Sequence, residues 1–119
     1  MNTPPKMEVI EQLMHSDLEL LCHGKYALNL KFENGNFLNI EAPFKFDKKE
    51  SIDDSPVCSF PLSISRLSRA IGSKIVEIKC DTDGSLGMIF SNGDALEVYA
   101  NDKKYEAYSI SINGKIYVL

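Results

Sequence analysis

The sequence contains few of the residues that cross-link small proteins. Its three cysteines, Cys22, Cys58 and Cys80, form no CxxC pair and leave an odd one over. This spacing is typical of free thiols in a reducing compartment rather than of a disulfide framework or a zinc site. The sequence also predicts neither a signal peptide nor a membrane span, because its first residues are not basic and no apolar run is long enough. We therefore expect a cytoplasmic protein.

An excess of positive charge is absent as well. The chain has 13 basic and 17 acidic residues, a formal net charge of -4 and an isoelectric point near 5.1. Nucleic-acid binding relies on concentrated positive potential, so this composition disfavours it. Residues 1–60 carry ten acidic and six basic side chains, whereas residues 61–119 carry seven of each. Any acidic face should therefore come from the first half.

The residues that are present describe an ordinary globular domain. Of the 119 residues, 44% are hydrophobic. A chain of this size and composition can fill one core without metal ions or disulfides. We expect a single domain over residues 1–119.

Two segments of the chain are similar to one another. When residues 17–42 are placed on residues 75–100 at an offset of 58, eight of the 26 pairs are identical. The identical pairs are Glu19/Glu77, Cys22/Cys80, Leu28/Leu86, Phe32/Phe90, Asn34/Asn92, Gly35/Gly93, Leu38/Leu96 and Ala42/Ala100. The matching residues follow a strand-like alternation, and two Asn-Gly turns coincide. The pattern favours an internal duplication.

Each repeat is predicted to begin with a short helix. The first follows Thr3 as its N-cap, has two prolines in its opening turn and ends near His15. The second runs from about Ser63 to Gly72, a residue suited to a left-handed helix end. A strand follows each helix, and alternation predicts that these side chains point inward: Leu18, Leu20, Cys22, Val76, Ile78 and Cys80.

Asn-Gly turns are expected to close three hairpins. At Asn34-Gly35, a two-residue loop would oppose apolar and polar rows, whereas a three-residue loop with glycine in the left-handed position joins the apolar rows. The predicted loops are residues 33–35, 91–93 and 112–114. The predicted pairs are Leu30 with Leu38, Leu28 with Ile40, Met88 with Leu96, Leu86 with Val98, Ile110 with Ile116 and Tyr108 with Val118.

The predicted fold class is α+β. Two αβββ pseudo-repeats, about residues 4–46 and 62–106, would form one twisted, mainly antiparallel sheet with the helices on its apolar face. A C-terminal hairpin, residues 105–119, would extend this sheet. Residues 47–61 have no periodicity and carry four acidic and two basic side chains, so we expect an acidic linker loop there.

No catalytic constellation can be assembled from the sequence. His15, His23 and Cys22 lie near one another but lack the usual metal-ligand spacings, and Cys22 is more simply a core residue. Residues 81–84, Asp-Thr-Asp-Gly, begin like a calcium loop but lack its later donors, so a turn is the better interpretation. We expect a non-enzymatic protein with no catalytic residues, no metal and no cofactor.

Surface side chains remain as candidates for recognition. Aromatic anchors beside a charged rim suit protein binding. The alternative is that the aromatics, which include Phe44, Phe46 and Tyr99, pack on the sheet and that the carboxylates are simply solvated. The candidate partner-binding residues are Asp47, Glu50, Asp53, Asp54, Tyr105 and Tyr108.

These strand and turn residues resemble a small bacterial domain family of unknown function. The first half carries its pattern between Gly24 and Phe46, centred on Leu28-x-Leu30-x-Phe32-x-Asn34-Gly35. The second half carries it in residues 67–76 and 84–98 and in the closing Tyr105-Glu106-Ala107-Tyr108, where the family commonly ends in tryptophan. The resemblance implies duplicated helix and hairpin units and carries over no catalytic residues. It also implies that some members are immunity proteins encoded beside toxin genes.

The function expected on these grounds is that of an immunity or inhibitor protein. An acidic domain can cover the substrate cleft of a basic toxin, such as a nuclease domain, and charge complementarity speeds the encounter. The alternatives are a small-molecule-binding module with an aromatic groove and a homo-oligomeric structural module, so both a monomer and a homodimer stay open. An enzyme using Glu41, Glu97 or Glu106 is least favoured, because no partner base is evident.

Overall fold

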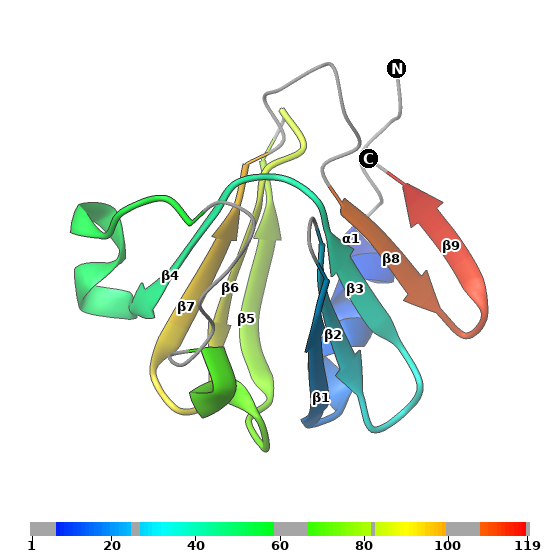
Figure 1. Cartoon of the computed structure of the whole chain (residues 1–119). Coiled ribbons are helices and arrows are strands. Elements are labelled where there is room, and N and C mark those ends of the chain that lie inside the picture. Colours follow the sequence, from blue (N-terminus) through cyan, green and yellow to red (C-terminus); the bar gives the residue numbers. More distant parts are fainter. Residues whose placement is uncertain (1–6, 25–26, 59–66, 82, 100–107, 119) are drawn as a thin grey trace.

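The chain folds into two antiparallel β-sheets that face one another (Figure 1). The computed structural model describes residues 7–24, 27–58, 67–81, 83–99 and 108–118. One sheet has five strands in the order β1-β2-β3-β8-β9, and the other has four in the order β4-β7-β6-β5. The strands are β1 (Leu18–His23), β2 (Leu28–Phe32), β3 (Phe37–Ile40), β4 (Phe44–Lys48), β5 (Ile75–Cys80), β6 (Leu86–Phe90), β7 (Asp94–Val98), β8 (Tyr108–Ile112) and β9 (Lys115–Val118).

The helical segments are too short to cover a sheet, so the predicted α+β arrangement is wrong. They are the α-helix α1 (Met7–Ile10) and the 3-10 helices η1 (Glu11–His15), η2 (Lys49–Asp54) and η3 (Leu67–Ala70). The first segment ends at His15 as predicted, and Gly72 has the expected left-handed conformation with φ 87°. Thr3 and residues 63–66 lie outside the described part of the chain.

A single core fills the space between the sheets. Alternate residues of β2, β3 and β6 are buried. Their side chains form one hydrophobic cluster with Leu96 and Val98 of β7 and with Ile10 and Leu13 of the N-terminal helical segment. Each fully buried aliphatic side chain of this kind contributes about 1.5–3 kcal/mol of transfer free energy. The apolar faces of the two sheets therefore bury each other, whereas the sequence predicted that helices would cover them.

The strands that follow the two central hairpins exchange sheets. β4 follows β3 in the chain but pairs with β7, and β8 follows β7 but pairs with β3. Figure 1 shows the connection from β3 crossing over to β4 in the neighbouring sheet. Because each half supplies a strand to the other half's sheet, the two halves form one cooperative unit rather than two separate lobes. The sequence predicted neither this exchange nor β4.

The strand register confirms two of the three predicted hairpins. Leu28 pairs with Ile40 and Leu30 with Leu38, and the equivalent pairs in the second half are Leu86 with Val98 and Met88 with Leu96. Gly35 and Gly93 adopt left-handed φ values of 88° and 92° in three-residue loops. The duplication itself stays a hypothesis about the origin of the chain.

The third hairpin was predicted with the wrong loop. Ile110 pairs with Tyr117 and Ile112 with Lys115, which leaves a two-residue loop of Asn113 and Gly114. Both residues have positive φ, 51° and 84°, as a type I′ turn requires. The change of loop length shifts β9 by one residue, so Ile116 is 62% exposed instead of inward-facing.

A β-bulge in each first strand overturns part of the predicted inward rows. β1 shifts register between Leu18 and Leu20, and β5 shifts between Ile75 and Glu77. One extra residue on the bulged strand reverses the parity of everything after it. Leu18 and Ile78 are buried and Cys80 is half-buried, as predicted. Ile75 is buried in place of Val76, and three residues predicted to point inward are exposed: Leu20, Cys22 and Val76.

Candidate functional site

Residues 47–58 of the predicted acidic loop extend the four-stranded sheet and form a short helix. Asp47 still belongs to β4, and η2 follows directly. Ile52 is buried beneath this short helix. The backbone N–H of Lys49 donates to the carbonyl of Gly93 at 3.0 Å, and Lys45 Nζ donates to the carbonyl of Asp53 at 3.1 Å. These contacts hold η2 in a fixed position beside β7.

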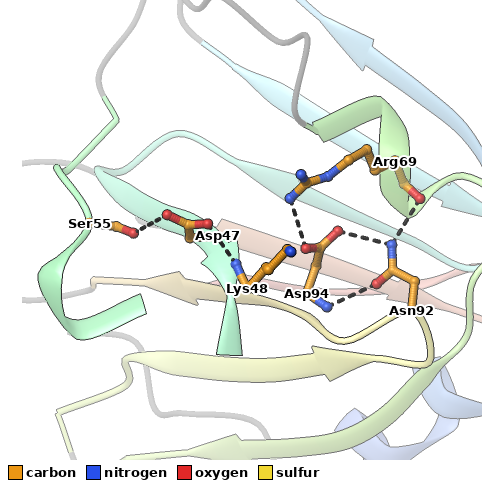
Figure 2. A network of polar contacts seen from close by, with 6 residues as sticks. All are labelled: Asp47, Lys48, Ser55, Arg69, Asn92 and Asp94. Carbon is orange, nitrogen blue, oxygen red and sulfur yellow. Dashed lines mark hydrogen bonds and ion pairs between the residues drawn. The ribbon is translucent and has the colours of Figure 1, made fainter. Parts of the chain in front are cut away.

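The four predicted carboxylates have different roles. Asp47 Oδ2 accepts a hydrogen bond from Ser55 Oγ at 2.6 Å, and Asp47 Oδ1 accepts one from the backbone N–H of Lys48 at 2.8 Å (Figure 2). Asp47 therefore stabilises the end of β4. Glu50, Asp53 and Asp54 are exposed, and within the described residues their carboxylates have no partner. Three of the four are thus available for binding.

The aromatic candidates do not form a surface patch in the described residues. Tyr108 is only 1% exposed, and its hydroxyl donates to the carbonyl of Gly84 at 2.8 Å, which ties β8 to the opposite sheet. Burial is the main cause that raises the pKa of this phenol far above its usual value. Phe44 and Phe46 are buried too, which confirms the packing interpretation for these three. Tyr105 lies outside the described part of the chain.

A second polar network fastens η3 to the turn between β6 and β7 (Figure 2). Arg69 Nη2 donates to Asp94 Oδ1 at 2.8 Å, where the side chains are 43% and 5% exposed. Asn92 Nδ2 donates to Asp94 Oδ2 and to the carbonyl of Arg69, both at 2.9 Å. Both carboxylate oxygens of Asp94 have donors, so this network is structural.

A groove of about 300 Å³ lies on the outer face of the four-stranded sheet, beside η2. No sequence pattern predicts it, because its walls come from η2 on one side and from β5, β6 and β7 on the other. The one local signal was Gly87, a glycine inside a predicted strand. The residues that line the groove are Lys49, Ile52, Asp53, Glu77, Lys79, Gly87, Met88, Ile89, Ala95 and Glu97.

Charges of both signs flank the floor of this groove. Glu97 of β7 and Lys79 of β5 both pair with Gly87 of β6, so they stand on either side of a position without a side chain. Glu97 Oε1 accepts a hydrogen bond from Tyr99 Oη at 3.0 Å. Burial, this hydrogen bond and the charges of Glu97 and Asp53 raise the pKa of Tyr99 from 10.0 to about 12. The phenol therefore remains a donor that orients the carboxylate.

The described residues provide no metal site. They contain no group of three or more histidine, cysteine or carboxylate side chains positioned to hold an ion, and the side chains of His15 and His23 are not described. Cys22, Cys58 and Cys80 form no disulfide. At Asp81 the chain makes the predicted turn, with the Gly84 N–H donating to the Asp81 carbonyl at 2.9 Å. Among the described helices, none combines the length and apolar character needed to span a bilayer.

Comparisons with known proteins identify a family but no function. Searches of curated proteins and of solved structures gave no significant match. A family of unknown function, DUF6188, matches residues 22–119, which include every strand from β2 to β9. The match agrees with the resemblance to an uncharacterised domain family noted in the strand and turn residues. The chain therefore belongs to the family of unknown function DUF6188.

Proposed function

We propose that this chain is a non-enzymatic binding protein that neutralises a basic partner, as a bacterial immunity protein neutralises its toxin in the cytoplasm. The observation that supports the proposal is the set of three exposed carboxylates on η2, Glu50, Asp53 and Asp54, none of which has a partner in the described residues. Exposed charges raise the rate of association with a partner surface of opposite charge and disfavour partners of like charge.

The contacts that hold η2 on the sheet support this proposal. Ile52 is buried, the Asp47 carboxylate accepts from Ser55, and the Lys49 N–H binds the carbonyl of Gly93. A surface fixed in its bound conformation avoids the entropic cost of ordering a loop on association. The carboxylates of η2 therefore suit a basic surface such as the substrate cleft of a toxin that acts on nucleic acid.

The test uses charge reversal on η2 with a matched control. The protein would be co-expressed with a basic toxin-like domain encoded beside its gene, and growth rescue and calorimetric affinity would be measured. We expect the triple variant Glu50→Lys, Asp53→Lys and Asp54→Lys to lose rescue and to weaken binding by at least about 100-fold, or ~2.7 kcal/mol. Asp47 is left intact because its carboxylate stabilises β4.

The control variant carries the same change in net charge on other elements. Glu8→Lys, Glu19→Lys and Glu33→Lys alter three exposed carboxylates on α1, β1 and the turn after β2. We expect this variant to rescue growth like the wild type. Equal binding by both triple variants, or the absence of any toxin-like neighbour gene, would contradict the proposal.

A further inference from the structure

We propose that the groove on the four-stranded sheet binds a free amino acid with an apolar side chain, recognised through both its ammonium and its carboxylate group. This proposal does not depend on the partner assigned to η2, although Asp53 of η2 belongs to both surfaces. Three features of the groove support this site: Gly87, the two charges beside it and the apolar part of the lining.

Gly87 is a glycine that the backbone does not require. It lies in the middle of β6, and it is not among the glycines with positive φ. A Cβ at this position would meet only Lys79 Cε and Cγ, at ordinary contact distances of 3.6 and 3.7 Å. Glycine inside a strand lowers stability by roughly 0.5–1 kcal/mol relative to alanine. The Lys79 side chain packs against this position. Glycine inside a strand often marks a site where a ligand approaches the backbone closely.

The two charges beside Gly87 are spaced for a zwitterion. Glu97 and Lys79 lie one strand away on opposite sides, so their Cα atoms are on the order of 10 Å apart. Neither side chain forms an ion pair within the described residues. Tyr99 occupies Glu97 Oε1, which leaves Oε2 without a donor in the described part of the chain. An amino acid above Gly87 would place its ammonium toward Glu97 and its carboxylate toward Lys79.

The rest of the lining combines the charged side chains of Lys49, Asp53 and Glu77 with an apolar part. Ile52 of η2 and Ala95 of β7 are buried, and Ile89 of β6 is half-buried. All three line the same groove, whose volume of about 300 Å³ is at the small end of ligand-binding sites. An aliphatic side chain would find apolar contacts here, and the site is too small for a large cofactor.

The experiment is a titration of the isotope-labelled protein with L-leucine, followed by amide chemical shifts. Two analogues serve as matched probes: leucinamide lacks the carboxylate, and N-acetyl-leucine lacks the ammonium group. We expect saturable shifts at Gly87, Ile89 and Glu97 with a dissociation constant on the order of 1 mM, since solvent-exposed ion pairs contribute little. Both analogues should bind at least about tenfold more weakly. Equal binding of leucinamide, or no shifts in the groove, would overturn the proposal.

Variants then tie the binding to the groove. Gly87→Val fills the floor and should abolish the shifts, whereas Asn29→Val, at the equivalent position of the other sheet, should leave them unchanged. Lys79→Met provides a second route if the valine variant does not fold. Its affinity for leucine should fall about tenfold, while its affinity for leucinamide should not change. Unchanged leucine binding in a folded Gly87→Val variant or in Lys79→Met would refute the site.

Discussion

The two sheets have matching inner faces and different outer faces. Inside, the pairs formed by β2 and β3 recur in β6 and β7 with apolar residues at every equivalent position. Outside, Asn29 and Asn39 of the five-stranded sheet correspond to Gly87 and Glu97, and Phe37 corresponds to Ala95. Gly87 and Ala95 are smaller than their counterparts and leave room for a groove. The core constrains both inner faces alike, whereas the outer faces are free to diverge.

The turns of the two hairpins likewise share their backbone geometry but differ in their outer contacts. Asn34 Oδ1 accepts from the Asn36 N–H at 3.1 Å, and Asn92 Oδ1 accepts from the Asp94 N–H at 2.9 Å. The turn geometry is therefore shared. The buried side chain that follows differs, because Asn36 accepts from the backbone N–H of Asn113 while Asp94 binds the guanidinium of Arg69. At each turn, the buried side chain therefore suits the polar group of the element that packs on it.

The largest effects are expected in the shared core. Phe32 and Phe90 occupy equivalent, fully buried positions in β2 and β6. Truncation of either to alanine should lower the free energy of unfolding by about 3–5 kcal/mol, because both lose burial and leave a cavity. Urea denaturation of the two variants would measure this. A difference of more than about 2 kcal/mol between them would mean that the sheets are not equivalent inside.

Exchange of the side chains at the turns should lower stability in both directions. Asp94→Asn removes the charge that pairs with Arg69, and Asn36→Asp introduces a buried carboxylate with no cation beside it in the described residues. Each change should cost about 1–3 kcal/mol at pH 7. Chemical denaturation would show it. A neutral result for Asn36→Asp would indicate that this turn is more open to water than its burial suggests.

Alanine at the floor of the groove should raise stability. Gly87→Ala restores an ordinary strand residue without a close contact, so we expect a gain of about 0.5–1 kcal/mol. Asn29→Ala at the matched position should change stability less, because asparagine already has a side chain. Thermal and urea denaturation of both variants would test this. A loss of stability in Gly87→Ala would show that glycine serves the fold at this position.

The smallest effect concerns the pH dependence of Tyr99. Its pKa is raised from 10.0 to about 12, so the folded state holds the proton more tightly than the unfolded state. The resulting contribution to stability is complete below pH 10 and is lost as the pH rises toward 12. An NMR titration of the assigned ring would measure the pKa. Glu97→Gln should lower it toward 10, and an unchanged value would exclude the carboxylate as a cause.

Local patterns were sufficient to predict the two central hairpins. Alternation of apolar residues, together with Asn34-Gly35 and Asn92-Gly93, fixed which residues pair, because a one-residue slip would turn each apolar row to solvent. The same reasoning failed at Asn113-Gly114, where asparagine adopts a positive φ and permits a shorter loop. It also failed at the bulges of β1 and β5, because an extra residue leaves no mark in the composition of a strand.

Contacts between distant segments decided the rest. The exchange of β4 and β8 between sheets depends on edges that the hairpins leave open, and no local pattern specifies which edge a strand will join. The groove follows from that exchange, since β4 brings η2 to the sheet that contains Gly87 and Glu97. Hairpin register depends on neighbours in the chain, which a single sequence displays. Sheet order and surface sites depend on which distant strands bury each other's edges, and the free energy of that choice is shared by the whole core.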